Sequence, residues 1–141
     1  MKRFQSLFVV AALLLAGCTT DPYRTAIKGS SDVSQAVSSA IKITASYYST
    51  GVFSDGQKAT AAKYFTIVTD CNLTFRKSVV DVHNAGKTGA QAFLPIVEGF
   101  VSCVKNSAPV VSDPKVSNVL KTVDLTINAI TLAISNAKGA Q

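Results

Sequence analysis

The sequence predicts an all-α fold, an antiparallel four-helix bundle, and three observations lead to it. Four segments repeat apolar side chains at spacings of three and four residues, the period of one helix face. Short breaks of glycine, proline and polar residues separate these segments. Cys71 and Cys103 lie at equal distances from the middle break, as residues facing each other across an antiparallel helical hairpin do.

The first helix is predicted from residue 31 to about residue 48, with Ser31 or Asp32 as its N-cap. Its apolar face consists of Val33, Val37, Ala40, Ile41, Thr44 and Tyr48. The glycine-containing segment 49–56 ends it. Residues 18–30 are polar and show no periodicity, so we expect a tether there.

The second helix is predicted over 57–85, with Gly86 placed for a left-handed C-cap. Its apolar stripe consists of Tyr64, Val68, Cys71, Phe75, Val79 and Val82. Thr88 and Gln91 resemble a capping box for the third helix, and Pro95 either starts that helix or kinks its first turn. The third helix has an apolar face of Phe93, Val97, Phe100, Val101 and Val104.

The fourth helix shows the most regular pattern, after Asp113 as N-cap and Pro114 at the first helical position. Its stripe alternates spacings of four and three residues: Val116, Leu120, Val123, Ile127, Ile130 and Ile134. The many β-branched residues favour a strand, but a strand requires a period of two, so the spacing predicts a helix.

Cys71 and Cys103 are predicted to form a disulfide, because an even pair in an exported chain is typical of one. Cys71 lies sixteen residues before residue 87 and Cys103 sixteen after it. A closed loop of this length contributes about 3–4 kcal/mol by the chain-entropy estimate, which is a large share of the ~5–15 kcal/mol stability of a small domain.

The N-terminus joins a basic start, Met1-Lys2-Arg3, to an apolar run over 7–15 that is too short to span a bilayer. Its end, Leu15-Ala16-Gly17-Cys18, resembles the lipobox of bacterial lipoproteins. That resemblance implies a signal peptide over 1–17 and a lipidated, palmitate-bearing Cys18. We therefore expect a lipidated tether over 18–30 and a helical domain over 31–141.

The resemblance also implies a location. Thr19 stands where lipoproteins retained in the inner membrane often carry aspartate, so we expect anchoring in the outer membrane, facing the periplasm. The inner membrane and the cell surface stay open as alternatives.

Composition argues against several classes of function. The mature chain carries twelve basic and eight acidic side chains, a net charge of +4, in scattered positions, which predicts no nucleic-acid surface. His83 is the sole histidine and Glu98 the sole glutamate. Asp81 and His83 fall on different helix faces. We therefore predict no catalytic site, no metal and no cofactor.

The surface around the first break is the predicted contact with a protein partner. Tyr47, Tyr48, Val52 and Phe53 gather there, and aromatic side chains are typical interface anchors. The alternative is a loop folded back to cap the bundle with Phe53 inside. A second apolar set on the fourth helix, off its main stripe, either packs on a second neighbour or lines a groove; it consists of Val119, Leu125 and Leu132.

In size, lipid anchor, helical content and single disulfide the chain is similar to the helical pilotins, lipoproteins that carry secretin subunits to the outer membrane. The similarity is architectural and transfers no binding residue. It favours a non-enzymatic lipoprotein that binds an unidentified protein. Two alternatives stay open: an exclusion or immunity lipoprotein of a phage or plasmid, and a structural or stress lipoprotein of the envelope.

Overall fold

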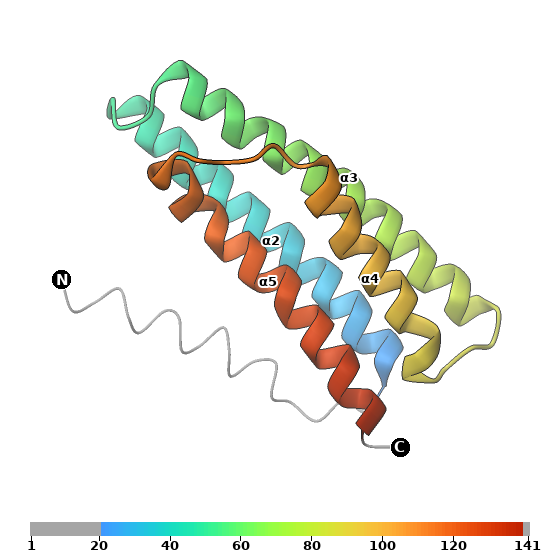
Figure 1. Ribbon diagram of the computed structural model, residues 1–141. Helices are drawn as coiled ribbons and strands as arrows, with labels where there is room; N and C mark the ends of the chain where they lie inside the picture. Colours follow the sequence, from blue (N-terminus) through green and yellow to red (C-terminus); the bar gives the residue numbers. More distant parts are fainter. Residues whose placement is uncertain (1–20, 140–141) are drawn as a thin grey trace, which may run out of the picture.

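The computed structural model of the chain describes residues 21–139, and they form an antiparallel four-helix bundle (Figure 1). The helices are α2 (Pro22–Ser49), α3 (Asp55–Asn84), α4 (Ala90–Ser107) and α5 (Pro114–Gly139). Around the bundle, α2 packs against α3 and α5, and α4 packs against the same two helices. The predicted fold class is confirmed. The predicted signal, Cys18 and Thr19 lie outside the described residues.

The helix α2 begins at Pro22, nine residues before the predicted start, so the expectation of a tether was wrong from that residue on. Asp21 is the N-cap, and its carboxylate accepts a hydrogen bond from the N–H of Tyr23 at 3.0 Å. The first turns bury Pro22, Ala26, Gly29 and Ser30. These small residues continue the buried face at helical spacing, but they lack the apolar bulk by which periodicity is recognised.

Most residues of the predicted stripes form the core, but Ile41 and Tyr48, which were assigned to the apolar face of the first helix, are exposed. All six stripe residues of α5 are buried, as are five of the six in α3, with Val82 partly buried. Gly86 has φ of +77° after α3, as predicted. At the start of α3, Ser54 and Gln57 form a capping box that was not predicted from the sequence.

The start of α4 differs from the expectation. Its N-cap is Gly89 and no side chain caps it, so the predicted Thr88–Gln91 capping box was wrong. Pro95 lies inside the helix, which begins five residues earlier. At α5 the predicted cap is confirmed, because Asp113 accepts from the N–H groups of Lys115 at 2.8 Å and Val116 at 3.2 Å.

The predicted disulfide joins α3 to α4, with the Cα atoms of Cys71 and Cys103 5.9 Å apart. At this register α4 ends before the start of α3 is reached. The chain then runs extended alongside the bundle to the start of α5 (Figure 1). Beyond the end of α4, the Tyr64 hydroxyl of α3 donates a hydrogen bond to Asp124 of α5. Burial of the Tyr64 side chain is the main cause that raises its pKa, and the hydrogen bond to Asp124 raises it further.

None of the helices within residues 21–139 combines the length and the apolar character that crossing a membrane requires.

Candidate binding groove

The predicted partner surface around the first break is divided by the fold. Phe53 is 3 % exposed and belongs to the core, so it does not form part of a contact surface. Tyr47, Tyr48 and Val52 remain 39–40 % exposed. The alternative that the sequence left open, a loop folded back with Phe53 inside, is the arrangement found.

Backbone hydrogen bonds fold this loop back. The N–H groups of Val52 and Phe53 donate to the carbonyl of Tyr47 at 2.8 and 3.1 Å, and Gly51 makes the turn with φ of +73°. The Phe53 ring meets the Tyr47 ring edge-on at 5.3 Å. The loop is thereby a closed cap on the end of the bundle.

Tyr48 is held in one position beside the start of α3. Its hydroxyl donates to Asp55 at 2.8 Å, and this hydrogen bond raises the pKa of Tyr48. The Lys58 ammonium lies 3.8 Å from the centre of its ring, a cation–π contact. Both partners stand on α3, so they tie the end of α2 to that helix.

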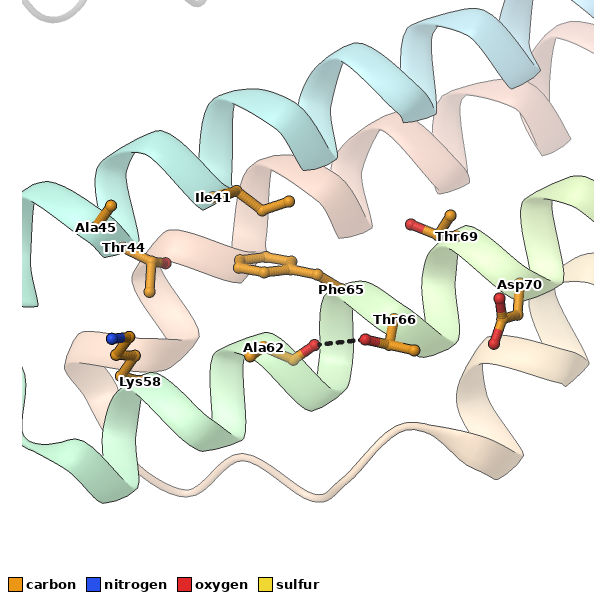
Figure 2. A pocket seen from close by; sticks show the side chains of 9 residues that line it. All are labelled: Ile41, Thr44, Ala45, Lys58, Ala62, Phe65, Thr66, Thr69 and Asp70. Atoms are coloured by element: carbon orange, nitrogen blue, oxygen red, sulfur yellow. Dashed lines mark hydrogen bonds between the residues drawn. The ribbon is translucent and has the colours of Figure 1, made fainter.

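Next to this cluster an apolar groove of about 440 Å³ opens between α2 and α3 (Figure 2). Side chains of both helices line it: Ile41, Thr44, Ala45, Lys58, Ala62, Phe65, Thr66, Thr69 and Asp70. Ala45 of α2 and Ala62 of α3 are too small to close the space between the helices. Phe65 is buried at 5 % exposure, whereas Ile41 is 48 % exposed, so the groove has an apolar floor and an apolar rim.

The two ends of the groove carry opposite charges. Lys58 and Asp70 both lie on α3, twelve residues apart, which corresponds to about 18 Å of helix. This is the length of about three helical turns. An apolar channel of this length with a cation at one end and a carboxylate at the other suits an amphipathic helix laid along it.

One polar atom in the groove lacks a partner. The hydroxyl oxygen of Thr44 is buried and makes no hydrogen bond within the described residues. The hydroxyl of Thr66, by contrast, donates to the carbonyl of Ala62 at 3.1 Å (Figure 2).

This groove was not predicted from the sequence, although one residue of the sequence indicated it. Ile41 was assigned to the buried face of the first helix, yet nearly half of its surface is exposed. It lies one position beyond Ala40 and so flanks the stripe that points into the bundle. An apolar residue beside an already complete stripe is a signal of a second contact.

The remaining candidates do not line the groove. His83 is exposed and stacks on Tyr23 with ring centroids 3.8 Å apart, and Glu98 is exposed on α4. Of the second apolar set on α5, Val119 is buried, whereas Leu125 and Leu132 are exposed. Across residues 21–139 no group of three or more histidine, cysteine or acidic side chains is placed to hold a metal.

A smaller hollow of about 340 Å³ lies over the disulfide, between α3 and α4. Gly99 lines it, and a Cβ added at that position would meet no heavy atom within 4 Å. No charged residue lines it, so the groove between α2 and α3 is the more specific surface.

No family model, curated protein or solved structure matches the chain.

Proposed function

We propose that the chain is a non-enzymatic lipoprotein, anchored in the outer membrane through Cys18, whose bundle binds an amphipathic helix of a protein partner. The observation that carries the proposal is the groove between α2 and α3, with exposed Ile41 on its rim and opposite charges at its ends. The lipobox resemblance of Leu15-Ala16-Gly17-Cys18 supports the anchor.

The charges of the groove favour one orientation of the docked helix. A helix carries a partial positive charge at its N-terminus and a partial negative charge at its C-terminus. Its N-terminal turn, or a basic side chain, therefore suits Asp70, and its C-terminal turn, or an acidic side chain, suits Lys58. A helix bound in this way runs antiparallel to α3.

The apolar contacts of the groove set its specificity. Ile41, Ala45, Ala62 and Phe65 offer area to side chains spaced three and four residues apart on the partner, as in the mode in which pilotins hold the tail of a secretin. An assembly factor of that kind is the function that this surface supports best.

The groove is tested by photo-crosslinking in cells from two exposed alanines of α3. A photoreactive residue at Ala62 lies in the groove, and the same residue at Ala59 lies on the same helix outside it. We expect a protein adduct from position 62 and none from position 59. Equal adducts from both positions, or none from position 62, would contradict the proposal.

Two isoleucines of α2 provide a matched pair for the energetics. Ile41 and Ile43 are 48 % and 44 % exposed, but Ile43 does not line the groove. Ile41→Ser should weaken binding of the crosslinked partner about thirty-fold, since a good anchor contributes about 2 kcal/mol. Ile43→Ser should leave binding unchanged, with helical circular dichroism intact in both variants.

The anchor is tested separately. Cys18→Ala should abolish incorporation of radiolabelled palmitate and release the chain from membranes, because stable anchoring requires at least two acyl chains. A variant that stays bound to the membrane at mature size would overturn the lipid assignment.

A further inference from the structure

The bundle begins almost directly after the proposed lipid anchor. Thr19 and Thr20 are the two residues between Cys18 and Asp21, the N-cap of α2. The Cα atoms of Cys18 and Asp21 are therefore at most about 11 Å apart, whatever the conformation of the chain between them. So short a connection keeps the start of α2 close to the membrane surface.

The start of α2 is also firmly packed into the bundle. Pro22 and Ala26 are buried, and the Tyr23 ring stacks on His83 near the end of α3 with an angle of 12° between the ring planes. Gly29 lies in close contact with Ile130 of α5. The anchored segment is thus a fixed part of the domain, so the direction in which the chain enters α2 sets the orientation of the whole bundle.

The end of the bundle that contains the start of α2 is basic. It also holds the last turns of α3 and α5, the loop over 85–89 and the first turns of α4. The basic residues with described side chains in these segments are Arg24, Lys28, Lys77 and Lys87, and the acidic residues are Asp21 and Asp81. The carboxylate of Asp21 lies 3.5 Å from Nε of Arg24 and partly neutralises its charge. Lys87 is exposed in the loop.

We propose that this end of the bundle, the anchor end, rests on the headgroups of anionic phospholipids. The inference depends on the proposed lipidation of Cys18, and it adds an orientation to that anchor. Basic side chains held within a Debye length of an anionic surface are attracted to it. The short connection keeps the start of α2 within about 11 Å of the lipid-bearing Cys18, which is close to that range.

One consequence concerns the binding groove. Ile41 lies nineteen residues after Pro22 on α2, about 28 Å along the helix axis. With the anchor end on the headgroups, the groove opens at the far half of the bundle, well above the membrane. A partner helix then docks on a surface that the lipids do not cover.

The orientation is tested with the lipidated mature chain that begins at Cys18, its disulfide intact, in vesicles. A photoreactive residue replaces Thr88, which is exposed at the anchor end, or Ala59, which is exposed near the far end. One vesicle population is phosphatidylcholine alone and the other an equimolar mixture of phosphatidylcholine and phosphatidylglycerol. We expect phospholipid adducts from position 88, several-fold more abundant with phosphatidylglycerol, and none from position 59.

A charge-reversal pair tests the attraction itself. Lys87→Glu should lower the yield of the adduct at position 88 several-fold in the mixed vesicles. Lys63→Glu, an exposed lysine on the far half of α3, should leave that yield unchanged. Neither side chain makes a hydrogen bond or ion pair with another described residue. The Lys87 N–H, which donates to the carbonyl of Val82 at 3.2 Å, is kept in the variant, so both variants should keep the same unfolding temperature.

Three outcomes would overturn the proposal. Equal lipid adducts from positions 59 and 88 would show a bundle lying on its side, and no adduct from position 88 on a membrane-bound chain would show a bundle held clear of the headgroups. In both cases palmitate on Cys18 persists, so the lipid anchor stands while the orientation fails. Absence of palmitate would overturn the anchor and the orientation together.

Discussion

Ile130 of α5 occupies the space into which a side chain on Gly29 of α2 would project. A Cβ added to Gly29 would lie 2.6 Å from Cγ1 and 2.9 Å from Cδ1 of Ile130, far inside van der Waals contact. The absence of a side chain thus allows the two helices to approach closely near the anchor end. The glycine serves packing here, within a regular helix, and does not mark a flexible tether.

Gly29→Ala should therefore destabilise the bundle. Overpacking of a close-packed core costs about 1–3 kcal/mol, and Ile130 is buried and β-branched, so it has little freedom to move. Removal of a helical glycine alone contributes about 0.5–1 kcal/mol in the opposite direction. We expect a net loss of stability in urea unfolding.

Gly99→Ala is the matched control for this substitution. Gly99 also lies within a helix, but a Cβ there meets no atom within 4 Å. That variant should gain about 0.5–1 kcal/mol. If both variants were stabilised equally, the close contact between Gly29 and Ile130 would be refuted.

Some of these elements could be predicted from the sequence and others could not, for a physical reason. The stripe that ends in Ile127, Ile130 and Ile134 predicted α5 because large apolar residues repeat at helical spacing. The start of α2 escaped prediction because Ala26 and Gly29 bury little area of their own, and their position is decided by Ile130 on a distant segment. The groove escaped for a similar reason, since Ala45 and Ala62 create it jointly across two helices.

The disulfide should contribute substantially to stability. Cys71 and Cys103 are 32 residues apart in sequence, and closing such a loop in the unfolded chain corresponds to about 3–4 kcal/mol. Urea unfolding of the same protein with and without dithiothreitol measures this without altering side-chain volume. A midpoint that does not change on reduction would show that the unfolded state gains nothing from the crosslink.

Asp113 should make the stability depend on acid pH. The hydrogen bond from Gln57 at 2.7 Å, and then that from the N–H of Val116, lower the pKa of Asp113 below its usual 3.8. A lowered folded-state pKa means that the stabilisation is present above about pH 4 and is lost as the pH falls through the folded value. Asp113→Asn should flatten this part of the profile of unfolding free energy against pH.

A control on Gln57 checks the cause of that shift. Gln57→Ala removes the hydrogen bond that contributes most to it, so the pKa of Asp113 in the folded state should rise toward its usual value. The loss of stability on acidification should then be smaller in this variant and end at a higher pH. An unchanged acid profile in both variants would show that Asp113 titrates alike in the folded and unfolded chain.

Phe53 and Val52 should respond differently to the same substitution. Phe53→Ser removes a buried aromatic ring, for which losses of about 3–5 kcal/mol are typical. Val52→Ser alters a side chain that is 40 % exposed and should change stability by less than about 0.5 kcal/mol. Thermal unfolding followed by circular dichroism distinguishes them, and equal melting temperatures would place Phe53 outside the core.

Thr44→Val should stabilise the bundle, because the Thr44 hydroxyl is buried in the groove without a hydrogen-bond partner. An unsatisfied buried polar group costs about 1–3 kcal/mol, and valine keeps the shape and the β-branching. We expect a gain of about 1 kcal/mol in urea unfolding. Thr66→Val, on the facing wall, removes a hydroxyl that is bonded to Ala62 and exposed, so it should be nearly neutral.

A loss of stability in Thr44→Val would mean that its hydroxyl is bonded in the folded protein. A gain of stability with weaker binding of the partner would assign the hydroxyl to recognition of the docked helix.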